Sequence, residues 1–249
     1  MGLSNLVDRS LLELAWGFLP ALLAAARVAG FVAVAPLFGP EVDWRFRAVL
    51  GVMIAAATAP LAASRVEILA AAAIPSAIVW EIAAGALIAL PAALVMGAAR
   101  QAGELVAAGA GFSMAATLDP ASGEPLSPLG RLYGLIALAA FLALDGPLRL
   151  VTALVESYGG PTPRLDASLV ERLCHMMTWA LEIALQAAAP AAVAIVLSSA
   201  AVAWIGKVAP TSNLVVLAPA TRMTIGLVIV ILLLAALAGS LHETWRQVL

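Results

Sequence analysis

Residues 183–206 read IALQAAAPAAVAIVLSSAAVAWIG, a stretch of 24 residues without a charged side chain. A helix rises about 1.5 Å per residue and the hydrocarbon core of a bilayer is about 30 Å thick, so a helix of this length spans a membrane unaided. Residues 223–242 form a second such stretch, of 20 residues. The sequence therefore predicts two membrane-spanning helices in its C-terminal part.

The whole chain has this apolar character. Of its 249 residues 63% are hydrophobic and 11% are charged, whereas soluble domains average about 45–50% and about 25%. These values exclude a soluble globular enzyme and a disordered chain, and the net charge of −2 offers no basic surface to a nucleic acid. The single cysteine, Cys174, excludes an intramolecular disulfide and a multi-cysteine metal site. Residues 14–26 are followed by further apolar sequence, so we expect a first membrane-embedded helix there rather than a signal peptide.

Other apolar runs are too short for an unaided span. The runs at 105–118 and 132–144 have 14 and 13 residues, which is typical of buried, broken or re-entrant segments. Pro91 and Pro190 lie inside apolar runs, where a proline removes a backbone donor and kinks a helix. The freed carbonyls are satisfied only within protein or beside water. We therefore expect kinked and broken helices that mostly face other protein.

Charged residues inside apolar segments are candidates for function. This set comprises Arg27, Glu81, Arg100, Glu104, Asp145, Glu182 and Arg222. Arg100 and Glu104 separate the runs at 82–99 and 105–118, and their spacing of four places them on one helical face for a local pair. Two roles are open for the set: anchoring helices to neighbouring subunits, or lining a proton or ion pathway. A relay usually shows several acids on one stripe, and the sequence shows no such stripe.

Residues 109–128, GAGFSMAATLDPASGEPLSP, begin small and apolar and then become rich in turn residues. Pro120 disfavours a helical conformation at Asp119. A loop this long in a compact membrane protein is usually functional or disordered. It is either a solvated connection between two helices or a loop that obstructs an internal passage, with Phe112 and Met114 as an apolar seal.

The sequence lacks a recognisable catalytic arrangement. Gly111-Phe112-Ser113 is similar to the nucleophile segment of an intramembrane serine protease, but Met114 stands where a glycine should follow. Cys174 and His175 are adjacent and so do not share a helix face, and no further soft ligand accompanies them. We expect neither enzyme activity nor a cofactor or metal.

A series of short motifs, in a fixed order, runs from about residue 24 to the C-terminus. The motifs are Arg27-Val-Ala-Gly30, Ala35-Pro-Leu-Phe-Gly39, Glu81-Ile-Ala-Ala-Gly85, Ala102-Gly-Glu104, Gly111-Phe-Ser-Met-Ala115, Asp119-Pro120, Phe141-Leu-Ala-Leu-Asp-Gly146, Ser157-Tyr158, Ala209-Pro210, Asn213 and a turn from Pro219 to Arg222. In order and spacing they resemble the FliR family of the flagellar type III protein export apparatus, which is related to the SctT/SpaR family of virulence injectisomes.

The resemblance implies an all-α membrane protein with a single domain over residues 1–249. A FliP-like part would cover residues 1–165 and a FliQ-like helical hairpin residues 166–249. The chain would join FliP and FliQ, next to FlhB and FlhA, in the bacterial inner membrane at the flagellar basal body. The assembly would be the gate through which unfolded flagellar proteins leave the cytoplasm.

The resemblance also implies that the loop at 109–128 plugs the pore of this gate. The plug residues would be Gly109, Gly111, Phe112, Ser113, Met114, Asp119 and Pro120. The glycines would let the loop bend, while the two large apolar side chains close the passage by contact and dewetting. A secondary transporter or a small channel is the alternative function; it predicts inverted repeats, and the sequence shows none.

Overall fold

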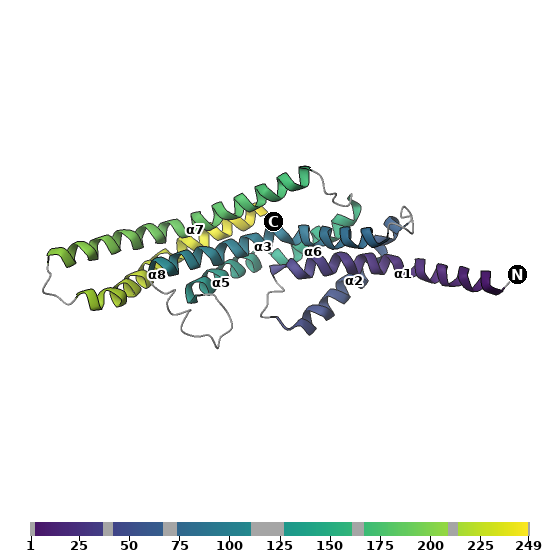
Figure 1. The fold of residues 1–249 in the computed structure, drawn as a ribbon, viewed down its shortest axis with the longest axis horizontal. Helices are drawn as coiled ribbons and strands as arrows, with labels where there is room; N and C mark the ends of the chain where they lie inside the picture. Colours follow the sequence, from purple (N-terminus) through teal and green to yellow (C-terminus); the bar gives the residue numbers. More distant parts are fainter. Residues whose placement is uncertain are drawn as a thin grey trace. The chain divides into compact units, whose positions relative to one another are not determined.

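The computed structural model describes residues 3–36, 42–66, 74–110, 127–160, 167–208 and 214–248 (Figure 1). Every regular element in these ranges is a helix, which confirms the expected all-α fold. In chain order they are α1 (Leu3–Val34), α2 (Trp44–Val66), α3 (Ile74–Ala110), α5 (Pro128–Ala143), α6 (Gly146–Glu156), the 3₁₀ helix η4 (Ser157–Gly159), α7 (Ala167–Val208) and α8 (Leu214–Val248).

Several of these helices have the length and composition of membrane spans. Among the described residues, three helical stretches qualify by themselves: Trp44–Ala62, Ile74–Ala110 and Ala167–Ala201. The number rises to five if the bent pair Pro128–Ala143 with Gly146–Gly159 and the bent pair Met223–Leu233 with Ala235–Arg246 each count as one span. The chain is a multi-pass membrane protein.

The helices are kinked and broken as expected. Pro20, Pro60, Pro91 and Pro190 lie inside α1, α2, α3 and α7, and each removes one backbone donor from its helix. Between α5 and α6 the chain turns at Asp145, whose φ of 56° lies in the left-handed region.

One helix boundary differs from the sequence prediction. The expected turn at residues 219–222 is wrong, because α8 already begins at Leu214. Pro219 removes one backbone donor from this helix without ending it. Helix α3 continues as one helix of 37 residues through the two charges that divide the apolar runs at 82–99 and 105–118. Arginine and glutamate are good helix formers, so a charge divides an apolar run without ending a helix.

The chain folds into two compact units, each made of two separate stretches of sequence. Unit 1 consists of Met1–Ala93 and Pro147–Arg172, and unit 2 of Leu94–Gly146 and Leu173–Leu249. Helix α3 begins in unit 1 and ends in unit 2. Nothing in this division tests the expected FliP-like and FliQ-like parts, which stay predictions.

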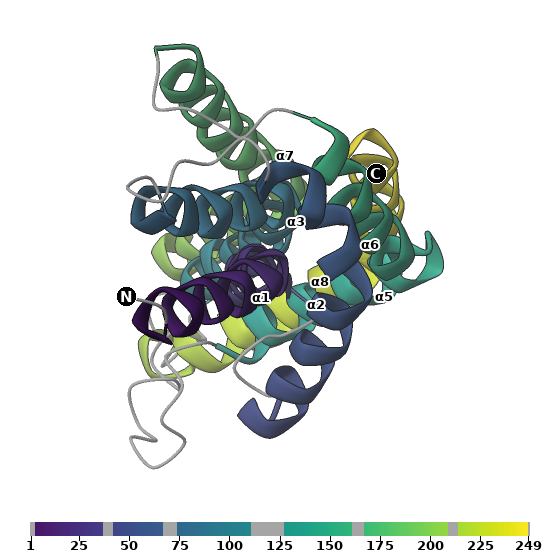
Figure 2. The same cartoon turned by 90° about the vertical axis from the view of Figure 1, so that its right-hand side faces the viewer.

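Unit 1 is built around α1. Helix α2 packs against α1 (Figure 1 and Figure 2), and Leu19 and Leu23 of α1 pack against Ile78 near the start of α3. Ala24 and Tyr158 form a second small buried cluster, with Ala62 from α2. The alanines of the second cluster, Ala24 and Ala62, let the backbones of α1 and α2 lie close together there.

In unit 2, α5 packs on α8. The indole of Trp245 is fully buried, and its centroid lies 4.6 Å from that of Phe141. Trp245 Nε1 also donates a hydrogen bond of 2.9 Å to the carbonyl of Ala137. A buried indole N–H almost always needs such a partner, so this bond fixes the C-terminal end of α8 on α5.

Candidate functional site

Arg27 in α1 and Glu81 in α3 form a buried ion pair in unit 1. Arg27 Nε donates to Glu81 Oε2 at 2.5 Å, and the two side chains are 1% and 4% exposed. Taking one charge out of water costs several kcal/mol, and a partner with good geometry offsets much of that cost. Two of the charges selected from the sequence thus meet each other, although 54 residues separate them along the chain.

Three further side chains complete what we call the Arg27 network: Ser157, Tyr158 and Thr58. Arg27 Nη1 donates to Ser157 Oγ at 3.0 Å, and the guanidinium carbon lies 4.4 Å from the centroid of the Tyr158 ring. A guanidinium over an aromatic face gains a cation–π interaction. The Tyr158 hydroxyl donates to Thr58 Oγ1 at 3.4 Å. The network therefore connects α1, α2, α3 and η4 within one buried cluster.

Two glycines allow α1 and α3 to cross next to this network. A Cβ atom on Gly30 would overlap the carbonyl oxygen of Ile82, and one on Gly85 would overlap the carbonyl oxygen of Arg27. Backbone therefore contacts backbone at the crossing, which only glycine permits. The two motifs of the sequence, Arg27 to Gly30 and Glu81 to Gly85, are the two sides of this crossing.

In unit 2 a second polar contact joins α3 to the start of α5. Glu104 Oε1 accepts a hydrogen bond of 2.7 Å from the backbone N–H of Ser127. Ser127 is fully buried and is the N-cap of α5, since its Oγ accepts from the N–H of Gly130 at 3.1 Å. A carboxylate near a helix N-terminus also interacts favourably with the helix dipole. A Cβ atom on Gly103 would overlap the backbone of α5 at Leu129 and Gly130, so these helices too are in backbone contact.

The local pair considered for Arg100 and Glu104 does not form between these two described side chains, because Glu104 turns to the N-terminus of α5. Arg100 is half-buried and lies over Gly134 of α5, where an added Cβ would come within 3.0 Å of Arg100 Cγ. Its stem thus packs against α5. The absence of a side chain at Gly134 makes room for that stem.

The remaining selected residues are spread over the chain. Gly109 lies near the end of α3, where an added Cβ would meet Ile195 of α7 at 3.5 Å. Glu182 is exposed on α7. Gly111, Phe112, Ser113, Met114, Asp119 and Pro120 lie outside the described residues, as does the side chain of Arg222.

Sequence reasoning missed two residues of these contacts. Thr58 and Trp245 were not selected, yet both donate or accept hydrogen bonds that connect separate helices. A tryptophan a few residues beyond the last long apolar run was the available signal for Trp245. Thr58 sits in an uncharged run and gave none.

The buried polar groups described above join helices within the chain. Within the described ranges, no three His, Cys, Asp or Glu side chains come together as a metal site would need. The Arg27 network contains one acid, Glu81, and its other members are hydroxyls and a guanidinium. These contacts connect helices that are far apart in the sequence, and the two roles considered for the charged residues stay predictions.

Long apolar helices, broken by prolines and joined by a few buried polar contacts, define a multi-pass α-helical membrane protein. Residues 18–248 match the family "Bacterial export proteins, family 1". The chain belongs to this family, which confirms the resemblance stated from its motifs.

Two curated relatives carry the name flagellar biosynthetic protein FliR. The one from Pectobacterium carotovorum subsp. carotovorum is 27% identical over 133 residues, and the one from Escherichia coli (strain K12) is 32% identical over 134 residues. Each alignment covers 53% of this chain and 51% of the relative, so the chain spans about half the length of the curated relatives it matches.

Proposed function

We propose that this chain is a subunit of the export gate of a flagellar type III secretion system. With FliP and FliQ it forms the channel through which unfolded flagellar proteins cross the bacterial inner membrane, next to FlhA and FlhB at the basal body. The observation that carries the proposal is the family match over residues 18–248, together with two relatives named flagellar biosynthetic protein FliR.

The distribution of burial supports assembly with other membrane proteins. The three unbroken candidate spans lie in α2, α3 and α7. Within the chain, 17% of the apolar window is buried in α2, 44% in α3 and 33% in α7. Large apolar side chains remain exposed on α2 and α7, including Val52 at 69%, Met53 at 62% and Trp204 at 74%. Proline kinks leave carbonyls that need a partner other than lipid, and neighbouring subunits supply one.

To test the assembly, the full chain with an affinity tag is expressed alone and together with FliP and FliQ of the same bacterium. We expect FliP and FliQ to co-purify with it in detergent at a fixed ratio, and the chain alone to aggregate or to be degraded. An unrelated multi-pass protein carrying the same tag is the control for non-specific retention. A well-behaved monomer that retains neither protein contradicts the proposal.

We further propose that the loop at 109–128 is the plug of this gate. The described residues on both sides of it are firmly held: Ala110 and Ser127 are fully buried, and Glu104 accepts the N–H of Ser127. Such anchored ends restrict where the intervening segment can reach, as a plug requires.

Deleting residues 111–118 in an otherwise intact apparatus tests the plug. We expect the membrane to become permeable to small solutes, which an efflux assay of a small dye measures. Deletion of residues 246–249, which follow the buried Trp245, is the control for loss of residues as such. If the complex assembles normally and permeability stays at the wild-type level, the loop is not the plug.

A further inference from the structure

Helices α3 and α5 of unit 2 are joined by a polar contact that we call the Glu104 clasp, made of Glu104, Ser127 and Gly130. Glu104 Oε1 accepts a hydrogen bond of 2.7 Å from the backbone N–H of Ser127, and Ser127 Oγ accepts one of 3.1 Å from the N–H of Gly130. Ser127 is 0% exposed, so its backbone N–H depends on this carboxylate for a partner. Glu104 thereby fixes the residue from which α5 starts.

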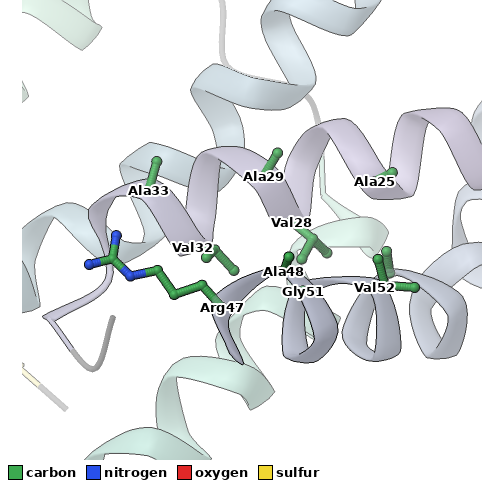
Figure 3. A pocket seen from close by; sticks show the side chains of 10 residues that line it. Ala25, Val28, Ala29, Val32, Ala33, Arg47, Ala48, Gly51 and Val52 are labelled. Carbon is green, nitrogen blue, oxygen red and sulfur yellow. The ribbon is translucent and has the colours of Figure 1, made fainter. Parts of the chain in front are cut away.

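The two helices pack closely at the clasp. Between α1 and α2 of unit 1, by comparison, a groove of about 430 Å³ remains, and a Cβ atom added to Gly51 would meet only Val32, at 3.7 Å (Figure 3). A Cβ atom on Gly103 of α3 would come within 2.6 Å of the carbonyl oxygen of Leu129 in α5. The backbones of α3 and α5 therefore touch, and the start of α5 has no room to shift toward α3.

Gly130 makes room for the carboxylate of the clasp. A Cβ atom at this position would overlap Glu104 Oε1. The carboxylate therefore lies against the backbone of α5, where the glycine has no side chain, and reaches the N–H of Ser127 from there. The clasp depends on one side chain from α3 and on a missing side chain in α5, so it can be broken from either helix.

The clasp lies at the base of the loop at 109–128. Helix α3 continues past Glu104 to Ala110, which at 1.5 Å per residue is about 9 Å along its axis. Ala110 is 0% exposed, and the chain enters α5 directly after Ser127. One described end of the loop is therefore held at Ala110, and the other is held about 9 Å back along α3, at the level of Glu104.

The two ends are held by different kinds of contact. At the α3 end the contacts are apolar: Ala110 is buried, and a Cβ atom on Gly109 would meet Ile195 of α7 at 3.5 Å. At the α5 end Ser127 is held by a hydrogen bond to a carboxylate, and such bonds are stronger than those between neutral groups. Removing the Glu104 carboxylate therefore releases the α5 end and leaves the α3 end held.

We propose that Glu104 is a positioning residue for the closed state of the gate. By holding Ser127, it sets the place at which the loop at 109–128 returns to the helices, and its loss makes the closed gate leak. The inference rests on the proposed plug, and Glu104 acts through Ser127 rather than by contact with an exported protein. Because the clasp joins two helices of one chain, its loss should leave assembly with FliP and FliQ intact.

The test is dye efflux from cells that carry the otherwise intact apparatus, with Glu104→Ala or Glu104→Gln in the chain. Alanine removes the acceptor. A hydrogen bond to a charged group shifts an equilibrium by about tenfold or more, so we expect efflux about tenfold above that of the unmodified chain. Glutamine keeps a side-chain oxygen that accepts from Ser127, so it should restore most of the tightness. Gln101→Ala, at an exposed neighbour in α3, is the matched control and should not leak.

A second pair of variants addresses the clasp from α5. Gly130→Ala places a Cβ atom where the carboxylate lies and should leak as Glu104→Ala does, while the double variant should leak no more than either. Gly134→Ala is the control, because a Cβ atom there meets the stem of Arg100 at 3.0 Å and leaves the clasp unchanged. Deuterium exchange at the N–H of Ser127, measured by mass spectrometry on the complex with FliP and FliQ, should be about tenfold faster in both clasp variants than in both controls.

Deletion of residues 111–118 separates this inference from the plug on which it rests. If the deletion leaks while Glu104→Ala and Gly130→Ala stay at the wild-type level, although exchange at Ser127 is faster, Glu104 does not position the plug and the plug proposal stands. If the deletion does not leak either, both proposals fail. An equal leak from Glu104→Gln and Glu104→Ala would also contradict the role, because the glutamine oxygen still accepts from Ser127. Gly130→Ala leaves Glu104 in place, so it decides the question if Glu104→Ala fails to assemble.

Discussion

Arg27 illustrates how one residue organises the first unit. Among the described residues it is the second largest of the fully buried side chains, and it carries a permanent charge in a site that is 1% exposed. Its hydrogen bonds to Glu81 and Ser157 and its contact with Tyr158 offset the cost of burying that charge. Arg27 therefore holds α1, α3 and η4 together directly, and Tyr158 extends the network to Thr58 of α2.

Glu81→Gln should destabilise the fold strongly, because it leaves the Arg27 charge buried without a counter-charge. We expect a loss of about 3–5 kcal/mol in the free energy of unfolding, measured by denaturant titration of the chain in detergent together with the co-expressed FliP and FliQ. Glu156→Gln, an exposed glutamate of the same unit, should change it by less than about 0.5 kcal/mol.

The double variant Arg27→Met with Glu81→Leu should reverse the loss of stability caused by Glu81→Gln. Replacing both charges by apolar groups removes the desolvation cost together with the attraction, so most of the lost stability should return. A Glu81→Gln protein that unfolds like Glu156→Gln would show that the pair is not a structural anchor.

Sequence patterns identified Arg27 and Glu81 of this network, but they showed neither the pairing of these two residues nor the part that Thr58 takes. Arg27 and Glu81 stood out because charges are rare in apolar segments. Nothing in a linear pattern shows that side chains 54 positions apart meet. The local pairing considered for Arg100 and Glu104 failed for a related reason: the N–H of Ser127, distant in sequence, is the partner that Glu104 takes.

At the scale of elements, the crossing of α1 and α3 depends on the absence of two side chains. A Cβ on Gly85 would overlap the carbonyl of Arg27, which belongs to backbone and cannot rotate away. Gly97 in the same helix has nothing within 4 Å of a Cβ. We therefore expect Gly85 and Gly97 to respond differently to the same substitution.

Gly85→Ala should push the two helices apart and cost about 1–3 kcal/mol, as overpacking does in other interiors. Gly97→Ala should instead raise the stability by about 0.5–1 kcal/mol, because alanine restricts the unfolded chain and favours a helix. Thermal unfolding of both variants, each co-expressed with FliP and FliQ and solubilised in the same detergent, checks the difference. Equal responses would mean that the backbones do not touch at Gly85.

The course of the helices was predictable only in part. Apolar runs and prolines indicated an all-α membrane protein with kinked helices, and the structure confirms it. Helix ends were less predictable, because α3 passes through Arg100 and Glu104 and α8 begins at Leu214. Charged residues and prolines show where an apolar run of the sequence is interrupted. Where the helix ends depends instead on the hydrogen bonding of its backbone.

At the scale of the whole molecule, much apolar surface is left for partners. Leu232 on α8 is 75% exposed and Trp204 on α7 is 74% exposed, and exposed apolar surface of this extent belongs to a protein that lipid or other subunits cover. Membership of the export-protein family over residues 18–248 makes other subunits of an export apparatus the partners we propose.

Export itself is the most direct measure of this role. The gene for the chain is deleted in its own bacterium, and hook and filament proteins are then quantified in the culture medium with and without the chain supplied from a plasmid. We predict that deletion abolishes their export while their synthesis inside the cell continues, and that the plasmid copy restores it. Export at the wild-type level in the deletion strain would contradict the proposed gate function.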